Sequence, residues 1–335
     1  MSKRKKNGKM GPIGKFILIG VTCFIAVSLI LVFLTPFPAV YVLRYEFAKS
    51  TKVAPTNYDT IKAQVDVVRD LTYPSTAKDN KADIFTPKGN TIPLSTIIWV
   101  HGGAFVGGDK TDVDYFATCL AADGYAVISI NYQLAPYAKF PSPMRQLAEV
   151  YKWLETVQTT YLLDLTSLVL AGDSAGAHTV AVFTQAQISE DYADELGVEQ
   201  VIDPATIKAL LLYCGPYSIK KTNNVDNGLL RFFLERAAWA YFGTMEWTKF
   251  DNIASPVYHV TAGFPPCFIT DGNTGSFEEQ ARDMVAALED KGVTCESYFI
   301  PKEQAKVGHE FQFAMNTAAG IEAYQRTLTF LTNQL

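Results

Sequence analysis

Short runs of wholly apolar residues alternate with helical patterns along most of this chain. The clearest apolar runs, rich in β-branched residues, are 95–100, 125–131, 167–171, 209–214, 267–270 and 297–300. The helical patterns that alternate with them cover 111–123, 142–158, 175–188, 277–291 and 318–333. Strands that are apolar on both faces are typical of parallel sheets with helices on each side. The alternation therefore predicts an α/β fold with a doubly wound, mostly parallel sheet and right-handed crossovers.

A charge-free segment, residues 16–43, precedes this alternation. Its most apolar part, residues 16–34, is long enough as a helix to span the roughly 30 Å hydrocarbon core of a bilayer. Pro36 and Pro38 are expected to end that helix. Residues 1–15 hold six basic side chains and no acidic one. By the positive-inside rule, this arrangement predicts one transmembrane helix with a cytoplasmic N-terminus and the rest of the chain outside.

Two other interpretations fit the apolar segment less well. A cleaved signal peptide has a shorter apolar region and a small-residue cleavage site, and no A-x-A pattern follows here. A buried core helix is disfavoured because no charged residue interrupts the run. The segment is therefore predicted to be an uncleaved signal anchor in the cell membrane.

Charge and cysteine content limit the partners of the remaining chain. The net charge is −5, and the basic tail leaves −11 for residues 16–335, which argues against nucleic-acid binding. Cys119, Cys214, Cys267 and Cys295 are widely spaced and form no CxxC or Cys/His pattern, so no metal site is predicted. They are interpreted as small buried apolar residues, and a Cys267–Cys295 disulfide stays open.

The most specific local pattern is Gly172-Asp173-Ser174-Ala175-Gly176, between a predicted strand and a predicted helix. A serine at such a junction sits in a tight, strained turn that lifts its hydroxyl above the sheet edge. The flanking glycines remove side chains that would clash in that turn. The first amides of the helix can point at a reacting oxygen. This context predicts that Ser174 is a nucleophile.

A glycine pair follows the predicted strand 95–100 in the segment His101-Gly102-Gly103. Adjacent glycines let the backbone approach a substrate closely, and their N–H groups can point at a developing oxyanion. Gly102 and Gly103, together with the amide of Ala175, are therefore the predicted oxyanion hole.

A general base is expected among the four histidines. His309 lies in a loop after the last predicted strand and before the C-terminal helix, from which it can reach Ser174 across the top of the sheet. His101 belongs to the glycine segment, His178 follows the serine by one helical turn, and His259 is interpreted as structural. His309 is therefore the predicted general base.

Together these motifs resemble those of the α/β-hydrolase superfamily, in particular the hormone-sensitive-lipase-like carboxylesterases and their bacterial relatives. Segments 83–87, 108–110 and 131–136 agree with the resemblance, which covers about residues 65–333. It implies an α/β-hydrolase fold and cleavage of carboxylic esters through an acyl-enzyme on Ser174, with no cofactor. Substrate identity does not follow from the fold.

The resemblance also implies a catalytic aspartate in a Gly-x-x-Asp-x-Leu turn after the strand 267–270. Here the chain reads Asp271-Gly272-Asn273-Thr274-Gly275-Ser276-Phe277, which puts Gly275 at the position of the acid. Asp271, at the end of the strand, is the first candidate for a displaced acid, and Glu278 and Glu279 are the alternatives. A turn-forming role would equally explain an aspartate before glycine.

The predicted organisation is a cytoplasmic basic tail (1–15), a transmembrane signal anchor (16–43), a linker (44–64) and a catalytic domain (65–335). An aromatic-rich stretch, residues 216–258, is interpreted either as a cap over the site or as helices that pack on the sheet.

The function predicted from these features is hydrolysis of small-molecule esters by a membrane-anchored serine hydrolase with no metal or nucleic-acid partner. The alternatives are an amidase or peptidase with the same triad, and a non-catalytic surface binding protein on a hydrolase scaffold.

Overall fold

The sheet at the centre of the molecule has the predicted architecture. The computed structural model describes residues 11–49, 52–225 and 227–335. The strands in these residues are β1 (Val65–Thr72), β2 (Lys81–Pro87), β3 (Leu94–Val100), β4 (Ala126–Ile130), β5 (Leu163–Asp173), β6 (Ile207–Tyr213), β7 (Cys267–Thr270) and β8 (Cys295–Tyr298). They form one sheet in the order β1-β2-β4-β3-β5-β6-β7-β8. β2 pairs antiparallel with β1 and β4, and the remaining pairs are parallel.

Helices cover both faces of this sheet. α4 (Asp114–Ala122) and α11 (Ala318–Gln334) pack on one face, and α5 (Ser142–Tyr161), α6 (Ala175–Ile188) and α10 (Glu278–Asp290) pack on the other. Alternate residues of β3 point to opposite faces, so Trp99 packs in the first layer and Ile98 in the second. The doubly wound, mostly parallel fold is therefore confirmed.

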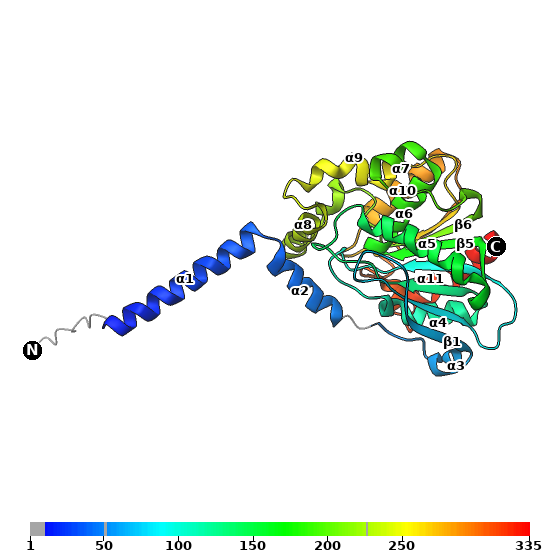
Figure 1. Ribbon diagram of the computed structural model, residues 1–335, viewed down its shortest axis with the longest axis horizontal. Helices are drawn as coiled ribbons and strands as arrows, with labels where there is room; N and C mark the ends of the chain where they lie inside the picture. Colours follow the sequence, from blue (N-terminus) through cyan, green and yellow to red (C-terminus); the bar gives the residue numbers. More distant parts are fainter. Residues whose placement is uncertain (1–10, 50–51, 226) are drawn as a thin grey trace, which may run out of the picture.

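Shorter elements connect these layers and build one end of the molecule. They are α3 (Tyr58–Lys62), α7 (Glu190–Leu196), α9 (Asp251–Ala254) and the 3-10 helices Lys110–Val113, Pro204–Thr206, Lys220–Asn223, Trp247–Phe250, Pro256–Tyr258 and Phe311–Phe313. The stretch 216–258 contains α8 (Gly228–Phe242) as its main helix. It lies at the end of the body nearest to α1 (Figure 1).

The two antiparallel strands, β1 and β2, were not among the predicted strands. β1 is a largely exposed edge strand with polar residues, so its sequence lacks a continuous apolar run. β2 carries the buried Asp83, whose carboxylate pairs with Arg69 at 2.7 Å and with Lys110 at 2.8 Å. These ion pairs allow a charge inside the sheet that hydrophobic patterning does not anticipate.

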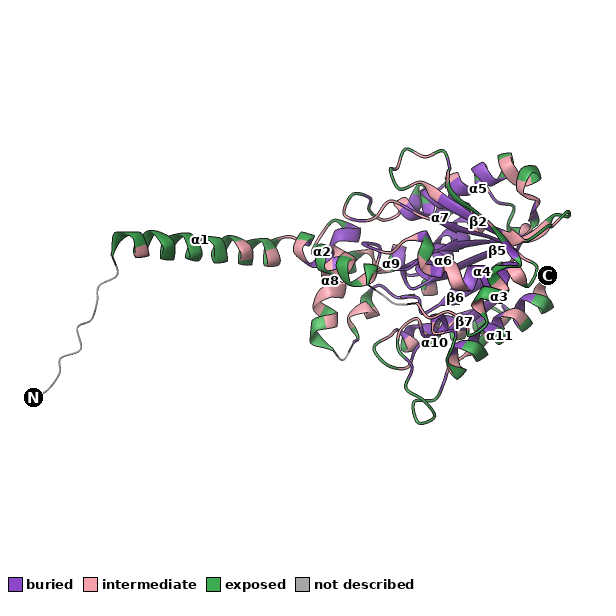
Figure 2. Ribbon diagram, turned by 90° about the horizontal axis from the view of Figure 1, so that it is seen from below, coloured by how far each residue is buried: buried purple, intermediate pink, exposed green. Residues whose placement is uncertain are grey.

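The N-terminal helix α1 (Pro12–Leu34) extends away from the body as a single exposed rod (Figure 2). Its 23 residues correspond to about 35 Å, its most apolar window has a mean hydropathy of 3.0, and none of that window is buried in protein. Within the described residues it is the one helix long and apolar enough to cross a membrane, and a signal sequence has the same properties. Most of the predicted basic tail, residues 1–10, lies outside the described residues.

A second helix, α2 (Phe37–Ala48), begins just after α1 and runs into the predicted linker. It packs against α8, and Val40 is buried in the same apolar cluster as Ala237. The Arg44 side chain donates to the carbonyl oxygens of Val106 at 2.6 Å and Ala135 at 2.9 Å. These contacts make α2 part of the folded body, although local sequence indicated only the end of an anchor and a linker.

Candidate active site

Ser174 occupies the turn between β5 and α6, as predicted. Its backbone has φ 50° and ψ −116°, a conformation that costs a non-glycine residue strain energy. The turn is possible because β3, β5 and α6 approach closely: a Cβ on Gly176 would meet the carbonyl oxygen of Val100, and a Cβ on Gly172 would meet the backbone of Gly176. The turn holds the serine hydroxyl at the carboxyl end of the sheet.

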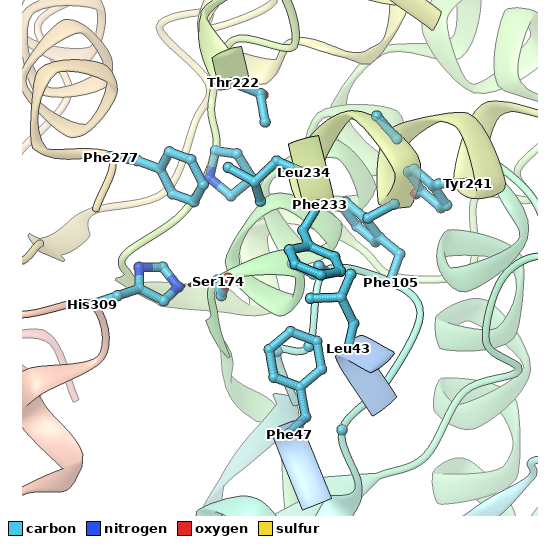
Figure 3. Close-up of a pocket in the computed structure, with 18 of the residues that line it drawn as sticks. Leu43, Phe47, Phe105, Ser174, Thr222, Phe233, Leu234, Tyr241, Phe277 and His309 are labelled. Atoms are coloured by element: carbon cyan, nitrogen blue, oxygen red, sulfur yellow. Dashed lines mark hydrogen bonds between the residues drawn. The ribbon is translucent and has the colours of Figure 1, made fainter. Parts of the chain in front are cut away.

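His309 is the histidine that reaches this serine. Its Nε2 lies 2.9 Å from Ser174 Oγ, and the ring comes from the loop between β8 and α11 (Figure 3). The rings of the other three histidines make hydrogen bonds to carbonyl oxygens of Gly102, Ala254 and Asn252. Loss of hydration lowers the pKa of His309, which keeps the ring neutral and able to accept a proton.

Asp271, the predicted acid of the triad, does not contact His309 directly. Its buried carboxylate accepts a hydrogen bond from the hydroxyl of Ser276, and Ser276 Oγ lies 2.6 Å from His309 Nδ1. Burial raises the pKa of Asp271 to about 6, and the nearby His309 opposes that rise. The structure thus connects Asp271 to His309 and Ser174 by hydrogen bonds through the hydroxyl of Ser276, which the sequence did not predict.

The alternative acids are engaged elsewhere. Glu278 pairs with Arg282 at 2.6 Å, within its own helix, and Glu279 pairs with Lys221 at 2.8 Å. Both lie in the first turn of α10, where a carboxylate is favoured by the helix dipole. Their contacts explain them without a catalytic role.

Of the predicted oxyanion donors, Gly102 already has a partner. Its N–H donates to Asp173 Oδ2 at 2.8 Å, while Asp173 Oδ1 accepts from the indole N–H of Trp99 at 2.8 Å. Within the described residues, no acceptor is hydrogen-bonded to the amides of Gly103 or Ala175, and both residues line the same cavity as Ser174. Asp173 therefore fixes the glycine segment, and two of the three predicted donors remain free to bind an oxygen.

Asp173 is itself an unusual group. Burial raises its pKa to about 8, and the adjacent carboxyl of Glu310 adds to that rise. The pKa of Glu310 is raised as well, because it too loses hydration there. Ionisation of both carboxyl groups at once is therefore disfavoured, which limits the negative charge near Ser174.

A cavity of about 220 Å³ is lined by Ser174 and His309. Its apolar wall comes from two segments far apart in sequence: Leu43 and Phe47 of α2, and Phe233, Leu234 and Tyr241 of α8 (Figure 3). The aromatic stretch 216–258 thus contributes a wall of the cavity, whereas the contribution of α2 had no signal in local sequence. An apolar cavity beside a serine hydroxyl suits an uncharged acyl or alkyl group.

Three potential metal ligands, Cys214, Asp271 and His309, have atoms within 4.8 Å of one another. Both ring nitrogens of His309 already face serine hydroxyls, and Cys214 Sγ accepts from the amide of Glu310 at 3.2 Å. A metal ion would have to break these hydrogen bonds, so the cluster fits a hydrogen-bonded network better than a metal site.

Cys267 and Cys295 face each other in the β7–β8 register as free thiols.

The sequence has relatives among known proteins. The sequence matches the protein family described as BD-FAE over residues 82–284. It is 25% identical to the esterase LipQ of Mycobacterium tuberculosis over 255 residues, 73% of this chain and 57% of LipQ. It is 24% identical to the acetyl esterase of Salmonella paratyphi B over 245 residues, 70% of this chain and 71% of that enzyme. The chain thus spans little more than half the length of LipQ.

Solved structures share the fold. Esterase B from Lactobacillus rhamnosis superposes with a TM-score of 0.76 at 19% identity, covering 89% of this chain and 96% of that one. A structure of the same esterase with a tributyrin phosphonate inhibitor has a TM-score of 0.72 at 19% identity and covers 96% of both chains. A bacterial heroin esterase has a TM-score of 0.68 at 20% identity, covering 89% of this chain and 97% of that one.

Proposed function

The chain belongs to the BD-FAE family, and on that premise we propose that it is a serine carboxylesterase held at the membrane by its N-terminal helix. The observation that carries the proposal is the 2.9 Å contact between Ser174 Oγ and His309 Nε2 beside an apolar cavity. A strained serine, an adjacent base and free backbone amides are the parts that acyl transfer requires.

The reaction follows from these positions. Ser174 Oγ attacks the ester carbonyl as His309 Nε2 takes its proton, and the amides of Gly103 and Ala175 stabilise the oxyanion. His309 then gives the proton to the leaving alcohol. A water molecule then gives a proton to His309 Nε2 as it attacks the acyl-enzyme. His309 returns that proton to Ser174 Oγ, and the acid is released. In this assignment Gly102 supports the oxyanion hole through its bond to Asp173, and Asp271 stabilises the imidazolium.

The cavity and the charge of the chain define the class of substrate. The wall formed by α2 and α8 is apolar, and residues 16–335 carry a net charge of −11. Short to medium uncharged esters fit this wall, whereas anionic esters are repelled. The relatives named as acetyl esterase and as a tributyrin-phosphonate-inhibited esterase support such acyl groups.

The N-terminal segment supports a location at the membrane. α1 is 23 residues long and carries no charged residue apart from one lysine near its start, and six basic residues lie in residues 1–15. In this proposal residues 1–15 stay in the cytoplasm, the anchor within residues 16–43 spans the membrane, and the catalytic domain, residues 65–335, lies outside.

A panel of p-nitrophenyl esters, from acetate to dodecanoate and including an anionic succinate half-ester, tests this function on the full chain in detergent. We expect turnover of the short and medium uncharged esters, a loss of at least about tenfold with the anionic ester, and no turnover by Ser174→Ala. Peptide p-nitroanilides in the same assay report amidase activity. Preference for the anionic ester or for the anilides would contradict the proposed substrate class.

A further inference from the structure

The hydroxyl of Ser276 stands where a carboxylate would be expected to meet His309. Gly275, at the position of the family's acid, has φ +61° and open space in the direction a Cβ would take. An aspartate would therefore not clash there, and aspartate is among the residues that tolerate this backbone region. The next residue, Ser276, instead places its Oγ 2.6 Å from His309 Nδ1.

Behind this hydroxyl lies a carboxylate with no other side-chain partner. Among the described side chains, Ser276 is the one hydrogen-bonded to Asp271, and it bonds to Oδ1. The other donor to Oδ1 is the amide of Phe277 at 3.4 Å, and Oδ2 is buried without a partner. The charge of Asp271 is therefore directed at His309 through one hydroxyl group.

The direction of the two hydrogen bonds follows from counting protons. An ionised carboxylate only accepts, and a serine hydroxyl has a single proton to donate. That proton goes to Asp271, so Ser276 Oγ must accept from His309, and the ring carries its proton on Nδ1. His309 Nε2 is then left unprotonated, facing the Ser174 hydroxyl at 2.9 Å, which is the form a general base needs.

We propose that Ser276 is a positioning residue that selects the reactive tautomer of His309 and carries the stabilising effect of Asp271 to the imidazolium. No proton crosses Ser276: when Nε2 takes the proton of Ser174, the Nδ1–H···Oγ and Oγ–H···Oδ1 bonds shorten and keep their protons. Ser276 touches neither substrate nor nucleophile. The inference rests on the proposed esterase function, because that function gives His309 its role as a base.

The test compares Ser276→Ala with Ser276→Thr, which keeps a hydroxyl, and with Thr274→Ala, which removes an exposed hydroxyl from the same turn. Steady-state kinetics on p-nitrophenyl butyrate should show kcat for Ser276→Ala reduced by about 10²-fold or more, with KM within about threefold. The kcat of Ser276→Thr should lie within about tenfold of the wild-type value, and the kcat of Thr274→Ala should equal the wild-type value.

A spectroscopic readout separates positioning from a structural role. Nitrogen NMR of the histidine rings in the full chain should place the proton of His309 on Nδ1 in wild type and redistribute it toward Nε2 in Ser276→Ala. A wild-type ring protonated on Nε2 would overturn the proposal, as would Ser276→Ala with kcat within about threefold of wild type, or a folded Ser276→Thr as impaired as the alanine variant. If wild type cleaves no ester, the proposed function fails, and the tautomer still tests the relay.

Discussion

Replacement of Asp271 by asparagine removes a charge and leaves the shape of the site intact. The amide oxygen can still accept from Ser276, so the loss is chiefly the attraction between the carboxylate and the imidazolium that forms during turnover. The Asp271 oxygen and the His309 nitrogen lie within 4.8 Å. Two unit charges at that distance attract by about 3.5 kcal/mol at an effective dielectric constant of about 20. Asp271→Asn should therefore lower kcat by about 10²- to 10³-fold, with a near-normal KM.

The assay is initial-rate kinetics with p-nitrophenyl butyrate on the full chain, with Glu278→Gln and Glu279→Gln as matched controls. Both controls also remove one carboxylate charge, but these carboxylates pair with Arg282 and Lys221 rather than with His309, so they should stay within about threefold of wild type. Wild-type kcat in Asp271→Asn, or a comparable loss in Glu278→Gln, would refute the reasoning.

The same substitution should increase stability while it lowers activity. Because burial raises the pKa of Asp271 to about 6, the folded chain binds a proton at this carboxyl more tightly than the unfolded chain does. This tighter binding stabilises the folded chain fully below the pKa that Asp271 has in the unfolded chain. The stabilisation is lost as the pH rises through about 6, and the free energy of unfolding then falls by about 3 kcal/mol. Chemical denaturation should show Asp271→Asn more stable than wild type at pH 8 and the difference shrinking toward pH 4.

Three further outcomes are expected. The value of kcat/KM should rise with pH through about 6, because Asp271 must be ionised and His309 neutral; a profile that stays flat down to about pH 4.5 would contradict this. Protease added to intact cells should digest the catalytic domain, as read on immunoblots, and protection until lysis would reverse the proposed orientation. Phe47→Ala, which removes part of the α2 wall, should raise kcat/KM for longer acyl esters relative to butyrate by about tenfold. The matched Tyr45→Ala, exposed on the same helix, should leave that ratio unchanged.

The parts of the fold that sequence predicted are those in which local pattern and tertiary environment agree. β7 matches its predicted bounds because four consecutive buried residues, Cys267–Thr270, form the strand. β8 begins two residues before the predicted start, since Cys295–Tyr298 is only partly buried and carries a charge. β1 and β2 were missed because exposure and the buried Asp83 ion pairs break the apolar pattern.

The site shows the same division between local and tertiary information. Ser174 and His309 were identifiable because a strand–helix turn and a loop at the same sheet edge restrict where such side chains can go. The partners of Gly102 and the role of Ser276 depend on contacts between residues that only the folded chain brings together. The one sequence signal for Ser276 was its position directly after Gly275, where the family's acid is missing.

Covalent trapping of the nucleophile tests the central claim most directly. The full chain is treated with a fluorophosphonate probe, and the labelled peptide is identified by mass spectrometry in wild type, Ser174→Ala and Ser276→Ala. The account predicts one probe per chain on Ser174 in wild type, none in Ser174→Ala, and slower labelling of the same serine in Ser276→Ala. An unlabelled wild-type chain, or a probe on another residue, would contradict the assignment of this protein as a Ser174 esterase.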